Sequence, residues 1–172
     1  LNDKQSQLAS LASLHPNFLT MLIADKAGIL TASYPAKLKD KLPAGSSVAN
    51  RPYFYQAKQT LRPVISDAFL GRGFGQDPIV ALSAPFIAAG EFDGIVEASL
   101  NLAKFSHMDR KLIDKSQGLI ILDDNKKVIY SSEQLELESL QDMSESPLLQ
   151  YLTQSANYFF INEKGKYQIA EW

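Results

Sequence analysis

The spacing of hydrophobic residues changes near residue 17. Before it, leucines recur at positions 1, 8, 11 and 14 beside small alanines, which is typical of a helix, and Pro16 ends the pattern. After it, apolar residues come in short runs between turn residues, which is typical of strands. The pattern predicts an N-terminal helix over residues 1–14. Its apolar stripe is narrow, so the helix packs either on its own domain or on a second copy.

The short runs predict an antiparallel sheet. Runs at 18–24 and 29–33 flank Asp25-Lys26-Ala27-Gly28, a turn sequence in which Gly28 can take a positive φ, so they predict a hairpin. Residues 34–45 are expected to be irregular or a short helix. The remaining elements expected in this half are helices at 51–61 and 103–115 and strands at 64–69, 79–87 and 94–102. Consecutive strands joined by short turns indicate an α+β domain.

The hairpin pattern then returns. Residues 23–33 and 121–131 align without a gap, 98 residues apart, with an apolar pair, an aspartate, a turn, a strand and a serine in step. This domain-sized repeat predicts a helix over 1–17, a first module over 18–105 and an incomplete second module over 106–172. In the second module we expect strands at 119–122 and 128–131, a helix at 147–152, and strands at 158–161 and 167–171.

Composition excludes several classes of protein. The 172 residues carry a net charge of −2, no cysteine and 45% hydrophobic residues. Disorder, a disulfide scaffold, a thiolate zinc site and a cysteine nucleophile are therefore excluded, and a nucleic-acid partner is not expected. No apolar stretch reaches the roughly 18 residues of a membrane span. Because residue 1 is not methionine, we expect a fragment of a longer protein.

The sequence contains few residues arranged for catalysis or metal binding. The two histidines, His15 and His107, have no nucleophile or acid at a suitable spacing. The sequence Asp123-Asp124-Asn125 lacks the closing glutamate of a calcium loop and is better explained as a turn. The glycines of residues 71–75 lack the ending of a phosphate loop and predict a flexible hairpin loop. We expect no enzyme activity, no metal and no cofactor.

One segment suggests a binding site. Arg51 lies beside Tyr53, Phe54 and Tyr55. A guanidinium can bind a carboxylate through two parallel hydrogen bonds, and aromatic walls shape a small cavity. The alternative is that the aromatic residues are core and Arg51 is a surface charge, which composition alone favours.

Four blocks in order resemble the double Cache (dCache) family of sensor domains. They are Val48-x-x-Arg51-Pro52-Tyr53-Phe54, then Ser66-Asp67-Ala68-Phe69 ending a strand, then an apolar strand ending Ser83-Ala84-Pro85, then a strand from Gly94 to Leu102. The resemblance covers residues 1–135 well and the rest loosely. It implies a long N-terminal helix and two PAS-like modules, each an antiparallel sheet flanked by helices.

The resemblance also implies a function. Such domains are extracytoplasmic, periplasmic parts of bacterial inner-membrane receptors, tethered by helices outside this sequence, and signal to histidine kinase, chemoreceptor or diguanylate cyclase outputs. The ligand is expected in the membrane-distal first module, and a homodimer is expected through the N-terminal helix. The residues implied in ligand binding are Arg51, Tyr53, Phe54, Asp67, Phe74, Ser83 and Ser99.

Two positions depart from the members that bind amino acids. Ser99 stands where those members have an aspartate for the ammonium, and Ser46 stands where they have a tyrosine. Losing a charged partner costs roughly 1.5–3 kcal/mol, which disfavours an amino acid and leaves a small carboxylate compatible with Arg51. The alternatives are a ligand-free spacer or dimerisation module of the same fold and, third, a small enzyme.

Overall fold

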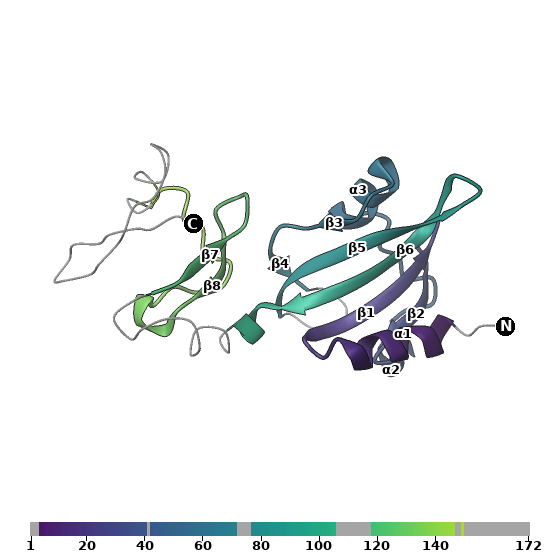
Figure 1. The fold of residues 1–172 in the computed structure, drawn as a ribbon, viewed down its shortest axis with the longest axis horizontal. Coiled ribbons are helices and arrows are strands. Elements are labelled where there is room, and N and C mark those ends of the chain that lie inside the picture. Colours follow the sequence, from purple (N-terminus) through teal and green to yellow (C-terminus); the bar gives the residue numbers. More distant parts are fainter. Residues whose placement is uncertain (1–3, 41, 72–76, 106–117, 147–148, 150–172) are drawn as a thin grey trace. The chain divides into compact units, whose positions relative to one another are not determined.

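The chain divides into two compact units, Leu1–Lys104 and Phe105–Trp172. The computed structural model describes residues 4–40, 42–71, 77–105, 118–146 and 149 (Figure 1). The α+β class predicted for the chain is confirmed, with an antiparallel sheet and helices in the first unit. No helix in the described ranges is long and apolar enough to span a membrane.

The first unit is built on one antiparallel sheet in the order β2-β1-β6-β5-β3, with β4 also paired to β5. The central strands β5 and β6 pair over nearly their whole length, from Ile79 opposite Asn101 to Ala88 opposite Glu91. The strands are β1 (Phe18–Asp25), β2 (Leu30–Tyr34), β3 (Val64–Ile65), β4 (Phe69–Leu70), β5 (Pro78–Ala88) and β6 (Glu91–Asn101).

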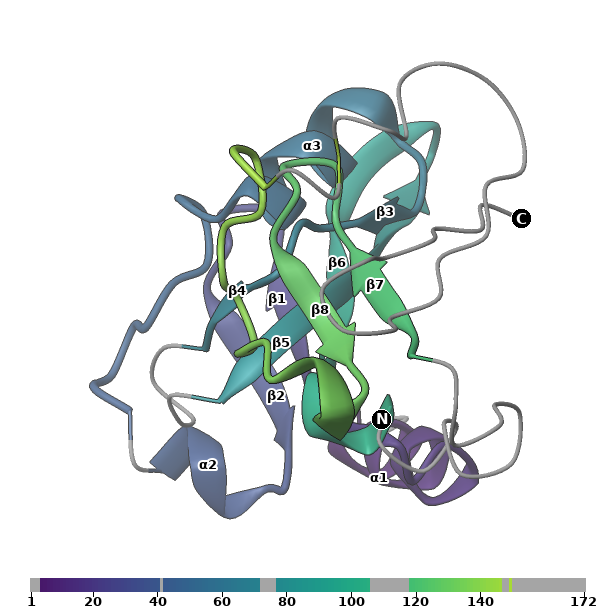
Figure 2. The same ribbon diagram turned by 90° about the vertical axis from the view of Figure 1, so that its left-hand side faces the viewer.

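One face of this sheet carries the N-terminal helix α1 (Lys4–Leu14) (Figure 2). Leu8 and Ala12, one turn apart, are buried against Met21 and Ile23 of β1 and Ala32 of β2. Gln5 adds a hydrogen bond from its amide Nε2 to the Ser33 carbonyl oxygen at 2.6 Å. The helix therefore docks on its own unit.

The apolar stripe predicted for this helix is partly wrong. Leu11 is 39% exposed and Leu14 is 74% exposed, although the leucine spacing placed both on the packed stripe. Leu8 and Ala12 suffice to cover the small patch of sheet beneath the helix. The other two leucines remain available on the outer side.

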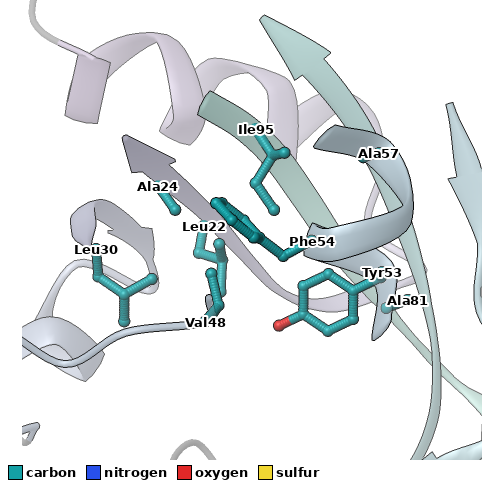
Figure 3. Close-up of a cluster of buried hydrophobic side chains, with 9 residues drawn as sticks. All are labelled: Leu22, Ala24, Leu30, Val48, Tyr53, Phe54, Ala57, Ala81 and Ile95. Atoms are coloured by element: carbon teal, nitrogen blue, oxygen red, sulfur yellow. The ribbon is translucent and has the colours of Figure 1, made fainter. Parts of the chain in front are cut away.

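The opposite face of the sheet carries α3 (Pro52–Thr60). Its residues Tyr53, Phe54 and Ala57 are buried against Leu22, Ala24, Leu30, Val48, Ala81 and Ile95 (Figure 3). Since Met21 and Ile23 face α1, the alternation along β1 divides the core into two layers. The helix ends at Leu61, which adopts a left-handed conformation with φ 53°. A short helix, α2 (Lys37–Asp40), lies in the region expected to be irregular or helical.

The strand predicted over residues 64–69 is wrong as a single element, because it splits into β3 and β4. At the break, the backbone N–H of Ser66 donates to the Ala81 carbonyl, while the Ala81 N–H is bonded to the Ser66 hydroxyl oxygen, both at 2.9 Å. A side chain thus replaces the backbone acceptor that would have continued the ladder. The chain then leaves the sheet until Phe69.

The helix predicted over 103–115 is not present as an α-helix at residues 103–105, the part of it that the structure describes. Residues Leu102–Phe105 form a short 3₁₀ helix, η1, and residues 106–117 lie outside the described ranges. A 3₁₀ turn is consistent with a connector between units.

The second unit contains the predicted second hairpin. Strand β7 (Ile120–Leu122) pairs with β8 (Val128–Ser131), and a 3₁₀ turn, η2 (Glu133–Leu135), follows. Val128, Tyr130 and Met143 are buried. The helix and strands expected over 147–171 fall outside the described residues, apart from Leu149 in a helical turn.

Candidate functional site

A cavity of about 230 Å³ lies in the first unit, on the face of the sheet that carries α3. Side chains from β1, β2, α3, β4, β5 and β6 and from the segment before α3 line it. Its polar lining residues are Thr20, Ser46, Ser47, Arg51, Tyr53, Asp77, Glu97 and Ser99. Its apolar wall includes Leu19, Leu22, Leu30, Leu42, Val48, Phe69 and Ile79.

Arg51 is positioned by the start of α3. Its backbone is extended, with φ −88° and ψ 136°, and Pro52 at the first helical position begins the helix. Its N–H donates to the Val48 carbonyl at 2.9 Å, which closes the turn leading into the helix. The half-buried side chain lines the cavity, and it forms no ion pair with any carboxylate in the described part of the chain.

Tyr53 forms a wall of the cavity. It is 5% exposed, and its ring stacks on that of Phe69 at 6.3 Å between centroids. Burial raises the pKa of the Tyr53 hydroxyl well above its usual range, the negative charge of Glu97 adds to the rise, and Arg51 opposes it. The phenol is therefore neutral at physiological pH and lies within electrostatic reach of both charged residues.

Glu97 is a buried residue of the cavity wall that the sequence interpretation missed. It is 2% exposed, lines the cavity, and accepts a hydrogen bond at 2.7 Å from the Ser99 hydroxyl to its Oε1. Burial raises its pKa from 4.5 to about 7, although the Ser99 bond pulls in the other direction. A signal was present: Ile95, Glu97 and Ser99 alternate along one strand, so a residue between two inward positions also faces inward.

Ser99 and Ser83 flank this carboxyl group. Ser99 lines the cavity, and the ligand-binding role that the resemblance implied for it stays a prediction. Ser83 lies directly opposite Glu97 in the pairing of β5 with β6, and its side chain is 2% exposed. The Ser83 Oγ has no hydrogen-bond partner among the described residues. Ser83 is thus beside the site, although it is not part of the cavity wall.

The other predicted site residues are placed differently. Phe54 is buried in the core and meets the ring of Phe92 edge to face at 5.5 Å, so it supports the site without lining the cavity. Asp67 is exposed, is not among the lining residues, and does not pair with Arg51. Phe74 lies outside the described residues.

Metal binding has no evident centre. Across the described ranges, no group of three or more histidine, cysteine, aspartate or glutamate side chains is arranged to hold a metal ion. The arrangement can instead bind a small organic molecule. It offers the Arg51 cation, the buried Glu97 carboxyl group, the Asp77 carboxylate and five hydroxyl groups, with an apolar wall around them.

Comparison of the fold with solved structures identifies its class. The extracellular domain of rpHK1S-Z16, named as a histidine kinase, matches with a TM-score of 0.70 at 20% identity over 93% of this chain and 66% of that one. An extracellular ligand-binding receptor from Desulfohalobium retbaense matches with a TM-score of 0.72 at 16% identity over 95% of this chain and 31% of that one. The chain therefore spans less than two thirds of either relative.

A third match is the ligand-binding domain of the Pseudomonas fluorescens chemoreceptor CtaA in complex with L-alanine. Its TM-score is 0.67 at 18% identity, over 96% of this chain and 71% of that one. The chain has the fold of the sensor domains of histidine kinases and chemoreceptors, as its resemblance to the double Cache family predicted. No protein-family model matches the sequence, and no curated protein matches it either.

Proposed function

We propose that this chain is the extracytoplasmic small-molecule sensing domain of a membrane-bound bacterial signalling receptor, with its ligand held in the first unit. The observation that carries this proposal is Arg51, a guanidinium without an ion-pair partner among the described residues, in the wall of a 230 Å³ cavity. A partly buried cation of this kind is suited to an anionic ligand group. The sensor fold supports the same function and gives no support to catalysis.

The size of the cavity limits the ligand. A volume of about 230 Å³ corresponds to about eight water molecules at ~30 Å³ each. A carboxylate of fewer than about ten non-hydrogen atoms fits this space, with its anionic group at Arg51 and its apolar part against Tyr53 and Phe69. The chemoreceptor domain in complex with L-alanine holds a ligand of that size.

Signalling follows from a difference in affinity between two states of the receptor, since a ligand shifts an equilibrium only by that difference. On this proposal, α1 lies on the sheet whose other face lines the cavity, and it connects the ligand-binding layer to the membrane helix. The alternative, a ligand-free spacer of the same fold, predicts a filled cavity and a fully solvent-facing Arg51, and the half-buried Arg51 in the cavity wall favours the sensing function over it.

The test is a thermal-shift screen of small carboxylates and amino acids against the 172-residue chain and its Arg51→Ala variant. We expect at least one compound to raise the unfolding temperature of the native chain and not that of the variant. Arg62→Ala, a change at an exposed arginine just beyond α3, is the matched control and should keep the response. Equal responses in all three proteins would reject Arg51 as the ligand-binding group.

The exposed side of α1 supports a homodimer. Leu11 is 39% exposed and Leu14 is 74% exposed, and burying them between two copies would remove apolar surface from water. We expect Leu11→Gln with Leu14→Gln to lower the dimer fraction in sedimentation analysis without changing the unfolding temperature of the monomer. An unchanged dimer fraction would exclude this face.

A further inference from the structure

We infer that Glu97 recognises a positively charged amine on the ligand, and that a proton leaves the Glu97 carboxyl group when that amine binds. The inference rests on the proposed function and narrows its ligand from small carboxylates to small zwitterions such as amino acids. It also makes the sensor respond to pH. The sequence interpretation disfavoured an amino acid because Ser99 lacks a charge, and Glu97, two residues earlier on the same face, supplies one.

The geometry around Glu97 leaves room for a cationic partner. The side chain is 2% exposed, and its hydrogen-bond partner in the described structure is the Ser99 hydroxyl, at 2.7 Å from Oε1. No lysine, arginine or histidine of the described residues forms an ion pair with it. Opposite it on β5, Ser83 is buried beside the cavity and carries no charge that could neutralise the carboxylate. A buried carboxylate with no cation is costly, so the empty site favours the neutral acid.

The surroundings of Glu97 contain few other charges. Arg51, just before α3, and Tyr53 of α3 line the cavity, and Asp77 lines it just before β5. The cavity walls from β1, β2, β4 and residues 42–48 hold only apolar and hydroxyl side chains. Arg51 is not a source of the shift in the Glu97 pKa, which burial dominates, so its positive charge remains available to the carboxylate of a ligand. The two groups therefore match the two charges of a zwitterion.

The proton balance follows from these charges. In the empty cavity below pH 7 the carboxyl O–H is intact, because burial holds its pKa at about 7. When an ammonium group enters, its N–H donates to the carboxylate, and the carboxyl proton passes to solvent. The bound pair has no net charge, and one proton is released for each ligand. Affinity for a zwitterion therefore rises with pH up to about 7 and is constant above it.

The size of the effect follows from the fraction of ionised carboxyl. Apparent affinity scales with that fraction, so an amino acid should bind about 30-fold more weakly at pH 5.5 than at pH 8. A carboxylate that lacks the amine makes no demand on Glu97 ionisation and should not weaken at low pH. The carboxylate should bind more weakly at pH 8 than at pH 5.5, because at pH 8 it would share the cavity with the unpaired Glu97 anion.

The experiment is isothermal titration calorimetry of the 172-residue chain at pH 5.5, 6.5 and 8. The probes are L-alanine with propionate and L-leucine with 4-methylpentanoate, each pair differing only in the amine. Measuring each titration in two buffers that both buffer at the chosen pH but differ in their enthalpy of ionisation gives the number of protons released. For the amino acids we expect close to one proton at pH 5.5 and close to none at pH 8.

Variants separate recognition from folding. Glu97→Gln keeps the shape of the neutral acid and should abolish both the proton release and the preference for amino acids, while propionate still binds through Arg51. Glu97→Asp should keep proton release, and Ser99→Ala retains the carboxyl group and should keep it too. Unfolding at pH 5, where Glu97 is already neutral, checks that Glu97→Gln folds.

The possible outcomes distinguish a failure of this inference from a failure of the proposed sensing function. Arg51-dependent binding with equal affinity for propionate and L-alanine, and no proton release, would overturn the inference and leave the proposed function standing. Amino-acid binding that is pH-independent, or that persists unchanged in Glu97→Gln, would also overturn it. No binding of any of the four probes at pH 8 would count against both.

Discussion

The two units share the same network of hydrogen bonds around their hairpin turns. In the first unit, Asp25 caps the β1–β2 turn, and the Val48 N–H donates to the Gly28 carbonyl at 2.8 Å. In the second unit, Asp123 caps the β7–β8 turn, and the Met143 N–H donates to the Lys126 carbonyl at 2.9 Å. A bulge falls at the same place in both hairpins, after Ile23 and after Ile121. The repeated sequence pattern thus corresponds to a repeated backbone.

The difference lies at the end of this network. In the first unit the Arg51 N–H donates to the Val48 carbonyl, and in the second the Ser146 N–H donates to the Met143 carbonyl. Arg51 and Ser146 therefore occupy equivalent positions, and the second unit has a serine where the first has an arginine. A proline follows in both cases. The shared backbone therefore presents the residue before the proline, and the identity of that residue determines whether a cation is supplied to the site.

The largest of these effects is expected at the β1–β2 turn of the first unit. A Cβ added at Gly28 would lie 2.7–2.8 Å from the backbone of Ala49, at a φ of 84°. We expect Gly28→Ala to lower the free energy of unfolding of the first unit by about 4 kcal/mol, measured by urea unfolding.

Gly45→Ala is the matched control, because its φ is 78° but nothing lies within 4 Å of the added Cβ. It should cost about 1 kcal/mol, which is the conformational penalty alone. Equal costs for the two variants would mean that the close approach to Ala49 does not constrain the turn.

The next effect separates the units by their response to pH. The raised pKa of Glu97 means that the folded first unit holds its proton more tightly than the unfolded chain does. Its stability should be greatest below about pH 4.5 and fall by about 3 kcal/mol as pH rises through about 7, and Glu97→Gln should remove this fall.

In the second unit the sign is opposite. Hydrogen bonds from Ser144 lower the pKa of the exposed Asp142, so its contribution is present at neutral pH and lost as pH falls. Thermal unfolding followed from pH 2 to 8 should show the two responses, because the Asp142 contribution is lost only below the ordinary aspartate pKa of 3.8. A native chain whose stability rises from pH 4.5 to 7 would contradict the assignment to Glu97.

A smaller effect concerns the residue before the proline. Arg51→Ser places the second unit's residue in the first, and it should weaken carboxylate binding by about 30-fold, the equivalent of about 2 kcal/mol for a charged hydrogen bond. Calorimetry with the best compound of the screen measures this change. Full affinity in Arg51→Ser would mean that the two units do not differ in ligand chemistry at this position.

The smallest effect is expected at Lys126, which has a positive φ of 63° where the first unit has Gly28. Lys126→Gly should raise the stability of the second unit by less than about 1 kcal/mol, because glycine adopts this conformation without a steric cost. Urea unfolding provides the measurement, and a loss of stability would show that the lysine side chain has a packing role.

Much of the fold could be predicted because local signals agreed. The turn at Asp25 to Gly28, Pro52 at the start of α3 and the alternation in β5 and β6 each act through neighbours in the sequence. The break at Ser66 could not be predicted, since it depends on Ala81, a residue 15 positions away. The same holds for Leu11 and Leu14, whose exposure depends on how much sheet α1 must cover.

The site was predicted in part for the same reason. Arg51, Tyr53 and Ser99 line the cavity because a sequence motif and strand alternation place them there. Glu97 also faces inward, but only the folded sheet shows how deeply its carboxyl group is buried. A charged residue at an inward-facing strand position is therefore a candidate site residue even when no sequence motif includes it.

The break after Ser66 also affects the behaviour of the chain at high concentration. A sheet edge with a row of free N–H and C=O groups is a template on which other chains can add as strands. Here that edge consists of two strands of two residues each, Val64–Ile65 and Phe69–Leu70. So short a template resists the edge-to-edge growth of aggregates, even though Ile65 and Leu70 are exposed apolar side chains.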